Sequence, residues 1–213
     1  MRQIEFFSDI AQLSDWDHRK KCNRLFFAVM PDIATAKQIY DTVQAFHREH
    51  GLDRVLQFIL REHVSILLVG DYKRRLRKKD IFAAELAARR ISMPAFDITF
   101  NAIGSFAGAP AAMNRLPHRP LVLRADDAGP RELRSQLRRA LGRKLLPASK
   151  AFIPHLTVSY GPEMVPFQPI APIRFTAGEL VLIHSEVGLT RYHVINRWPL
   201  TGGVADVTAL RVA

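Results

Sequence analysis

The 213-residue sequence contains only one cysteine, and this limits how the chain can be held together. Cys22 has no partner for an internal disulfide, and no cluster of cysteines and histidines has the spacing of a structural zinc site. Cys22 is therefore interpreted as a buried or incidental thiol. We expect the fold to be stabilised by packing rather than cross-links, and we expect neither a metal ion nor a cofactor.

Long apolar runs are also missing. No stretch approaches the roughly 18 apolar residues that a membrane-spanning helix needs. The first residues, Met1 to Glu5, lack the basic-then-apolar order of a signal peptide. These absences predict a cytoplasmic protein without a membrane partner.

Acidic residues are scarce beside basic ones: 20 Asp and Glu stand against 31 Lys and Arg, a formal net charge of +11. A field of this sign concentrates polyanions around a protein, so RNA, DNA and anionic membranes are all compatible with it. The hydrophobic content of 48% excludes general disorder and suits one domain or two closely packed lobes.

The hydrophobic pattern predicts alternating strands and helices. The apolar run at 24–30 indicates a buried strand, and apolar residues spaced three and four apart over 36–46 indicate a helix that Gly51 closes. The remaining expected strands lie at 54–59, 63–69, 96–106, 120–124, 155–160, 173–183 and 192–197, and the remaining helices at 81–90 and 130–144. We expect Phe82 and Leu86 to face inward, and 104–117 and 161–172 to be loops or turns.

Two short motifs carry the chemistry, one in each half of the chain. They are His63-Val64-Ser65 and His155-Leu156-Thr157, and each opens an apolar strand. Residues i and i+2 of a strand project from the same face, so each motif places an imidazole beside a hydroxyl. If the two strands are neighbours, the four side chains converge on one cleft.

Phosphodiester cleavage suits such a pair of histidines. One group must take a proton from the attacking oxygen while another gives a proton to the leaving oxygen, and imidazoles do both near neutral pH. Hydroxyls of Ser65 and Thr157 can donate hydrogen bonds to phosphate oxygens. A single His-x-Ser is common by chance, but two copies at the heads of strands in a basic chain favour a site. The other histidines have no hydroxyl at i+2 and are left out of it: His18, His47, His50, His118, His184 and His193.

The sequence resembles the two-histidine (2H) phosphoesterase superfamily, and most closely its bacterial 2′-5′ RNA ligase or RNA 2′,3′-cyclic phosphodiesterase branch. The resemblance runs from Arg24 to about Leu200. It rests on Arg24-Leu25-Phe26-Phe27-Ala28-Val29, on His63-Val64-Ser65-Ile66-Leu67-Leu68-Val69-Gly70-Asp71, on Pro154-His155-Leu156-Thr157-Val158, and on the closing segments Leu182-Ile183-His184-Ser185, Tyr192-His193-Val194-Ile195 and Trp198-Pro199-Leu200.

This resemblance implies an α+β, bilobal, pseudo-symmetric fold with two antiparallel sheets around a central cleft and helices outside. It also implies hydrolysis of 2′,3′-cyclic phosphate ends of RNA or nucleotides to 2′-phosphates. We expect 24–200 to form this single domain, with 1–23 as an N-terminal extension and 201–213 as a C-terminal tail. A monomer is expected.

Two positions depart from the family pattern. Ser65 stands where threonine is commoner, which preserves the hydroxyl, and Tyr160 stands where many bacterial members carry arginine. Tyr160 is a candidate substrate-binding residue, as plant members have tyrosine there. By position alone, Arg24, Arg61 and Arg115 are further candidates for substrate-binding cations.

The run from Lys73 to Lys79, in which only Leu76 is not basic, either contacts an RNA backbone or is a solvated helix start. Two other functions remain open beside the cyclic phosphodiesterase: a 2′-5′ ligase acting on tRNA ends, and a noncatalytic basic module that binds RNA. The near symmetry of the two motifs leaves open which histidine is base and which is acid.

Overall fold

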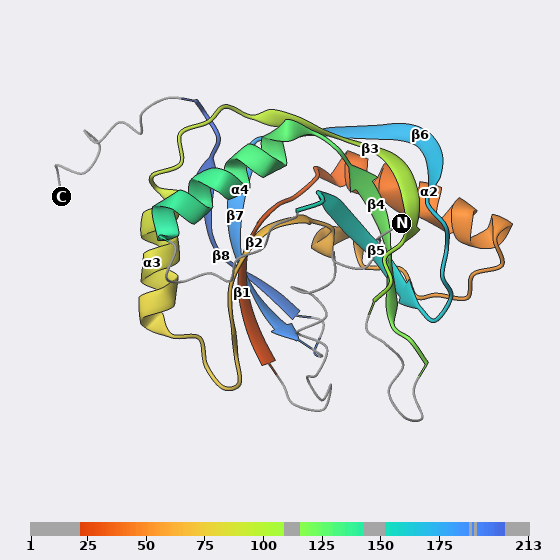
Figure 1. Cartoon of the computed structure of the whole chain (residues 1–213), viewed down its shortest axis with the longest axis horizontal. Coiled ribbons are helices and arrows are strands. Elements are labelled where there is room, and N and C mark those ends of the chain that lie inside the picture. Colours follow the sequence, from red (N-terminus) through yellow and green to blue (C-terminus); the bar gives the residue numbers. More distant parts are fainter. Residues whose placement is uncertain (1–21, 109–115, 143–151, 188, 190, 203–213) are drawn as a thin grey trace, which may run out of the picture.

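The computed structural model describes residues 22–108, 116–142, 152–187, 189 and 191–202 (Figure 1). Within these ranges the elements follow one another in the order β1 (Cys22–Val29), α2 (Ile33–Glu49), the short 3-10 helix η1 (Ile59–Arg61), β2 (Val64–Tyr72), α3 (Lys78–Ala88), β3 (Phe96–Ser105), β4 (Arg119–Ala125), α4 (Ala128–Leu141), β5 (His155–Gly161), β6 (Gln168–Ala177), β7 (Glu179–Val187) and β8 (Arg191–Pro199).

The strands form one antiparallel sheet in the order β6-β3-β4-β5-β2-β1-β7-β8. Its two halves, β6-β3-β4-β5 and β2-β1-β7-β8, meet at the β2–β5 boundary, where the register pairs Val64 with Leu156. The two antiparallel sheets expected from the sequence are thus four-stranded halves of a single sheet.

The helices and the sheet enclose the main core. Helices α3 and α4 pack on each other, α3 contacts β7, α4 contacts β2 and β3, and α2 packs against β6 (Figure 1). Strand alternation divides β1 between two faces: Leu25 and Phe27 are fully buried in the main core, whereas Phe26 and Ala28 belong to a smaller cluster with Ile183.

Helix α2 has well-defined ends. Asp32 caps its N-terminus by accepting a hydrogen bond of 2.9 Å from the Thr35 backbone N–H, which satisfies one of the first-turn donors. Just past its C-terminus, Gly51 adopts φ +60°, a conformation that favours glycine. The helix stop expected at Gly51 is therefore confirmed.

Most expected strands and helices are present, with ends displaced by a few residues. Residues 54–59 do not form a strand: Leu56 makes one isolated bridge to Ser159 of β5. The expected strand at 173–183 is two strands that turn at Gly178, and β6 begins inside the expected loop at 161–172. The last residues of the helix expected at 130–144 lie outside the described residues.

The prediction that Phe82 and Leu86 face inward on α3 is wrong. Phe82 is 67% exposed and Leu86 is 42% exposed, whereas Ala84, Ala87 and Ala88 are buried. Small alanine side chains let the helix approach α4 and β7 closely, so the larger apolar residues turn to the surface. None of the described helices is long and apolar enough to cross a membrane.

Candidate active site

The two His-x-hydroxyl motifs lie side by side at the centre of the sheet. The antiparallel register pairs Val64 with Leu156, and both side chains are fully buried. Continuing this register by one residue in each direction sets His63 opposite Thr157 and Ser65 opposite His155. Directly opposite residues share a face, so all four side chains line the face opposite the main core.

Both imidazole rings are oriented in the same way by the backbone. The Nδ1 atom of His63 lies 2.7 Å from the carbonyl oxygen of Arg61, and that of His155 lies 2.8 Å from the carbonyl oxygen of Ile153. Since a carbonyl can only accept, each Nδ1 carries a proton, and Nε2 holds the lone pair in the neutral ring. Ser65 Oγ lies 3.1 Å from Nε2 of His63 and donates to it.

Burial favours the neutral form of both rings. It lowers the pKa of His63 to about 4, with further lowering by the positive charges of His155 and Arg61, while the backbone hydrogen bond opposes the shift. Burial also lowers the pKa of His155, again against its backbone hydrogen bond. The lowering of the His63 pKa by the charge of His155 is consistent with two rings that lie close together.

Aromatic side chains pack around both imidazoles. The ring of His63 lies 5.2 Å from Phe26 and 5.5 Å from Tyr192, centroid to centroid. Phe106 meets the ring of His155 edge-on at 5.0 Å. The guanidinium of Arg61 lies 4.4 Å from the centroid of Tyr192. These apolar neighbours desolvate the imidazoles and so cause the pKa shifts.

A one-residue bulge follows the histidine in each motif strand. In β5 the pairing changes between Val122↔Thr157 and Leu121↔Ser159, so Val158 is the extra residue. In β2 the pairing with β1 changes between Ala28↔Ser65 and Phe27↔Leu67, so Ile66 is the extra residue. Each extra residue lies three positions after the histidine of its motif. A bulge shifts the alternation and re-aims the side chains that follow it.

The bulge in β5 brings Tyr160 to the histidine face. Simple alternation from His155 would place Ser159 there instead. Burial dominates and raises the pKa of Tyr160, while a hydrogen bond from Thr157 and the positive charges of Arg24 and Arg61 lower it. His118 stacks on the Tyr160 ring, with 4.5 Å between centroids.

Of the three candidate arginines, two lie at this site. Arg24 forms a two-pronged ion pair with Asp71, its Nε and Nη2 lying 2.8 and 3.0 Å from the carboxylate oxygens. Arg61 is the last residue of η1, two residues before His63. Arg115 lies outside the described residues. The basic residues of the run from Lys73 to Lys79 are exposed, between β2 and the first turn of α3.

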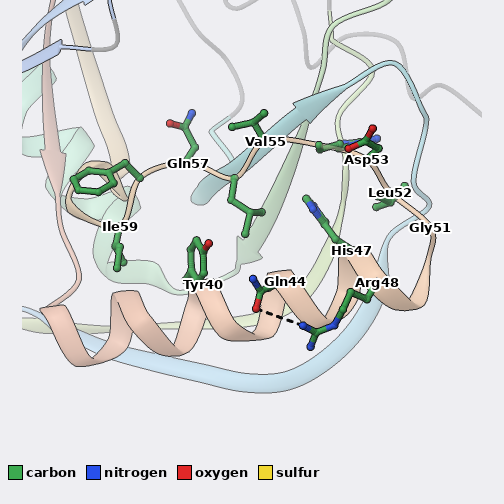
Figure 2. A pocket seen from close by; sticks show the side chains of 13 residues that line it. Tyr40, Gln44, His47, Arg48, Gly51, Leu52, Asp53, Val55, Gln57 and Ile59 are labelled. Atoms are coloured by element: carbon green, nitrogen blue, oxygen red, sulfur yellow. Dashed lines mark hydrogen bonds between the residues drawn. The ribbon is translucent and has the colours of Figure 1, made fainter.

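Ser159 supports the site from behind. Turned inward by the bulge, it is fully buried, and its Oγ lies 3.2 Å from Nε2 of the buried His47 on α2. His47 also lines a hollow of about 820 Å³ between α2 and the chain that follows it, into which Figure 2 shows it projecting. Burial, with the charge of Arg54, lowers the pKa of His47. This hollow is distinct from the face that carries His63.

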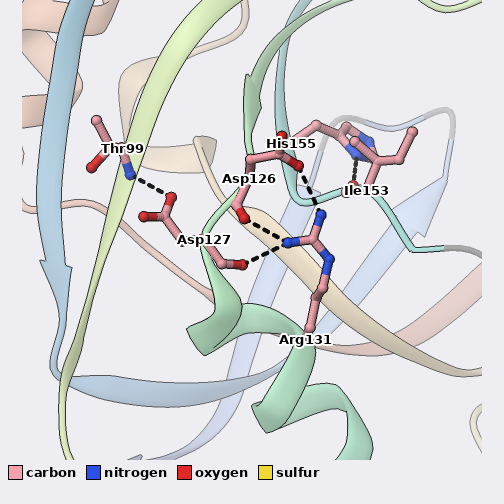
Figure 3. A network of polar contacts seen from close by, with 6 residues as sticks. All are labelled: Thr99, Asp126, Asp127, Arg131, Ile153 and His155. Atoms are coloured by element: carbon pink, nitrogen blue, oxygen red, sulfur yellow. Dashed lines mark hydrogen bonds and ion pairs between the residues drawn. The ribbon is translucent and has the colours of Figure 1, made fainter.

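A second network braces the strand beside His155 (Figure 3). Arg131 donates to the backbone carbonyls of Asp126 and Asp127 at 2.6 and 3.0 Å, and the Asp127 carboxylate accepts from the Thr99 N–H at 2.8 Å. Asp126 and Asp127 directly follow β4, which pairs with β5 as far as His155. The network therefore helps to position the second motif.

Sequence reasoning missed Phe106, Tyr192 and the supporting pair His47–Ser159. No local signal links them to the motifs, because the contacts join segments far apart in the chain. His184 and His193, which the sequence left out, bond instead to Asn23 and Glu186 at 2.7 and 2.6 Å. Across the described residues, no group of three or more His, Cys, Asp or Glu is arranged to hold a metal ion.

Solved structures with a similar fold include E. coli LigT complexed with ATP, with a TM-score of 0.63 and 24% identity over 84% of this chain and 99% of that chain. A protein solved as a phosphoesterase gives a TM-score of 0.64 and 24% identity, over 84% and 98% of the two chains. A third structure, from Thermus thermophilus, gives 0.63 and 19% identity, over 84% and 98%. Comparison with curated proteins gives no match.

The family model of the 2′-5′ RNA ligase superfamily matches residues 36–189, which include both His-x-hydroxyl motifs. The match covers most of the chain, and the antiparallel fold agrees with that of the LigT structures. The chain therefore belongs to the 2′-5′ RNA ligase superfamily of two-histidine phosphoesterase enzymes.

Proposed function

We propose that this enzyme hydrolyses the 2′,3′-cyclic phosphate at an RNA or nucleotide end to a 2′-phosphate, without needing a metal ion. The observation that carries the proposal is the matched pair of imidazoles. Each ring has its Nδ1 held by a carbonyl two residues earlier, at 2.7 and 2.8 Å, so that Nε2 is the atom left for proton transfer.

The reaction needs one proton moved at each end. A water oxygen bonds to phosphorus while Nε2 of His63 takes its proton, and the bond from phosphorus to O3′ breaks while Nε2 of His155 gives a proton to O3′. The product carries a 2′-phosphate, and both histidines exchange protons with solvent to return to their starting states. When the phosphate binds, the hydroxyl protons of Ser65 and Thr157 turn from His63 and Tyr160 to the nonbridging oxygens.

The surroundings favour His63 as the base. Its pKa is lowered to about 4, so its ring is neutral and ready to accept a proton across the physiological range. Binding of an anionic phosphate between the rings raises both pKa values, which brings the protonated form of His155 into reach. Arg24 and Arg61 both act electrostatically on Tyr160, and these three residues would contact the substrate beside the scissile phosphate.

The ligand class is supported by relatives of the same fold. E. coli LigT was solved with ATP, with NADP+ and with 3′-AMP, and each of these is a phosphorylated nucleoside. The family match also favours a second activity at the same site: a 5′-hydroxyl of RNA replaces water as the attacking group and a 2′-5′ bond forms. Both activities use the same proton transfers.

Turnover of a nucleoside 2′,3′-cyclic phosphate, with the product identified by phosphorus NMR, tests the proposal. We expect a 2′-phosphate product, and a loss of several orders of magnitude in kcat for His63→Ala and for His155→Ala. His193→Ala is the matched control, because His193 is exposed and bonds to Glu186 away from the site. EDTA should not change the rate.

A phosphodiester with a 4-nitrophenolate leaving group separates base from acid. This leaving group departs without a proton, so we expect it to restore much of the activity of His155→Ala but not of His63→Ala. Rescue of His63→Ala alone would reverse the assignment. Wild-type turnover that requires an added divalent metal, or RNA binding without turnover of any cyclic phosphate, would contradict the proposal.

A further inference from the structure

Beyond the histidines, the β3-β4-β5 half of the sheet carries a cation on the same face. Arg124 pairs directly with His155 across β4 and β5, and with Ala102 across β3 and β4. Directly opposite residues of an antiparallel pair project from one face. Arg124 therefore stands next to His155, on the side away from His63.

An aromatic row covers the sheet beside this arginine. Gly104 leaves room for it, because a Cβ at Gly104 would lie 2.6 Å from Cγ and 2.7 Å from Cα of Phe167. The Phe167 ring lies 5.7 Å from Phe106, whose ring meets His155 at 5.0 Å. The aromatic surface thus continues outward from the catalytic imidazole.

The ring of Phe167, rather than an acidic side chain, holds Arg124 over this surface. Its guanidinium carbon lies 5.1 Å from the centroid of Phe167. Within the described part of the chain, neither a carboxylate nor a hydrogen-bond acceptor pairs with it. A half-buried guanidinium on an aromatic face keeps its donors available to an anion.

We propose that Arg124, Phe167 and Phe106 form a subsite for the nucleotide that precedes the cyclic phosphate. The base of that nucleotide packs on the part of the Phe106 and Phe167 surface that Arg124 does not cover, and Arg124 binds the phosphodiester that joins it to the terminal nucleotide. Aromatic rings and arginine planes are the groups that hold unpaired RNA bases and phosphates. This inference rests on the proposed function and narrows its substrate to oligoribonucleotides of at least two residues.

Two substrates that differ by one nucleotide test the subsite: a nucleoside 2′,3′-cyclic phosphate and a dinucleotide ending in the same group. Arg124→Ala should lower kcat/KM about tenfold for the dinucleotide, chiefly through KM, as for the loss of one charge-assisted hydrogen bond. The mononucleotide should change by less than about twofold. Phe167→Leu should show the same selectivity, and Arg124→Lys should fall between Arg124→Ala and wild type.

Arg90→Ala is the matched control for charge, because Arg90 is exposed and follows α3, which packs on the opposite face of the sheet. It should not alter the preference for the dinucleotide. Equal losses on both substrates, or no loss on either, would overturn the subsite. Thermal melting followed by circular dichroism shows whether the Phe167→Leu protein folds. If it does not, the result for Arg124→Ala decides whether the subsite exists.

Failure of the proposed function is distinguishable from failure of the subsite. If wild type turns over neither substrate, calorimetry with a dinucleotide ending in a 2′-phosphate and with a nucleoside 2′-phosphate still measures binding. A tenfold weakening by Arg124→Ala for the dinucleotide alone would support the subsite. Equal affinity of wild type for the two ligands would reject it.

Discussion

At the scale of single residues, the environment separates two histidines that the sequence makes look alike. His63 contacts two aromatic rings and is near two positive groups, which lowers its pKa to about 4. For His155 the lowering comes from burial alone. Two groups of the same type in different surroundings can divide the work of base and acid.

This separation predicts an acidic optimum for kcat/KM. The base must be neutral, so activity falls as pH decreases through the pKa of His63, about 4. The acid must be protonated, so activity falls as pH rises through the pKa of His155, which lies below 6.5. A pH profile of kcat/KM on a cyclic phosphate should peak between these limits, and the profile of kcat should lie at higher pH because bound phosphate raises both pKa values.

An optimum of kcat/KM well above pH 7 would exclude these assignments. The variants that lack one histidine further test which histidine sets each limb of the pH profile. Residual activity of His63→Ala should lose the acid limb, and that of His155→Ala should lose the basic limb.

Glu62 is a buried carboxyl directly before His63. It is only 3% exposed, its Oε2 has no hydrogen-bond partner among the described residues, and burial raises its pKa to about 8. The folded state therefore holds a proton that the unfolded state loses above its ordinary pKa of 4.5. Folding stability contributed by this group is present at low pH and decreases as pH rises from 4.5 to about 8.

Glu62→Gln should remove this pH dependence, because an amide does not ionise. At pH 8 to 9 we expect the variant to be more stable than wild type, by on the order of 1–3 kcal/mol, and the difference to vanish near pH 4.5. Urea unfolding at both pH values measures it. The same gain at both pH values would mean that packing, not ionisation, is responsible.

At the scale of elements, the bulges in β2 and β5 decide which side chains reach the site. Without the extra residue Val158, alternation would bring Ser159 rather than Tyr160 to the histidine face. The bulge instead buries Ser159 against His47 of α2. One irregular residue thus places Tyr160 on the histidine face and Ser159 in the interior.

Ser159→Ala tests this anchor. The substitution leaves His47 Nε2 buried without a partner, which should cost about 1–3 kcal/mol of folding free energy. If the anchor also holds the bulge, kcat should fall a few-fold, since Thr157 and Tyr160 lose their exact placement. Ser135→Ala is the control, because Ser135 lies on α4 and its hydroxyl accepts a hydrogen bond from the exposed Arg139. Unchanged stability and activity would show that the bulge needs no anchor.

At the scale of the whole molecule, one part of the basic charge is exposed and lies away from the two motif histidines. The net charge of +11 includes the exposed basic run from Lys73 to Lys79, which lies beyond the end of β2 and at the start of α3. Helix α3 packs on the face of the sheet opposite His63. The run is therefore expected to contact long RNA rather than a mononucleotide bound at the histidines.

Salt dependence distinguishes these two roles. Binding of single-stranded RNA should weaken linearly in log Kd against log salt, and replacing Arg75, Arg77 and Lys78 by Gln should reduce the slope by about 2. Turnover of a nucleoside cyclic phosphate should be nearly unchanged by the triple substitution. Filter binding over a salt series measures the slope, and an unaltered slope would make the run a solvated helix start.

The local features, which depend on neighbours along the chain, could be predicted from the sequence. The alternation in His63-Val64-Ser65 and His155-Leu156-Thr157 is sufficient to place each imidazole beside a hydroxyl, and the spacing of apolar residues located α2, α4 and most strands. Family resemblance supplied the antiparallel fold and the family, which the comparisons support. The roles of the four motif residues stay predictions, since they depend on chemistry.

Features that depend on contacts between distant segments required the three-dimensional structure. It joined the two halves through Val64 and Leu156, turned Phe82 outward on α3, and set Arg124 beside His155. A periodic pattern tells which face of a helix is apolar, but the neighbours decide which face is covered. A strand bulge likewise depends on pairing, because two residues of one strand must face one residue of its partner. Neither strand's sequence shows this by itself.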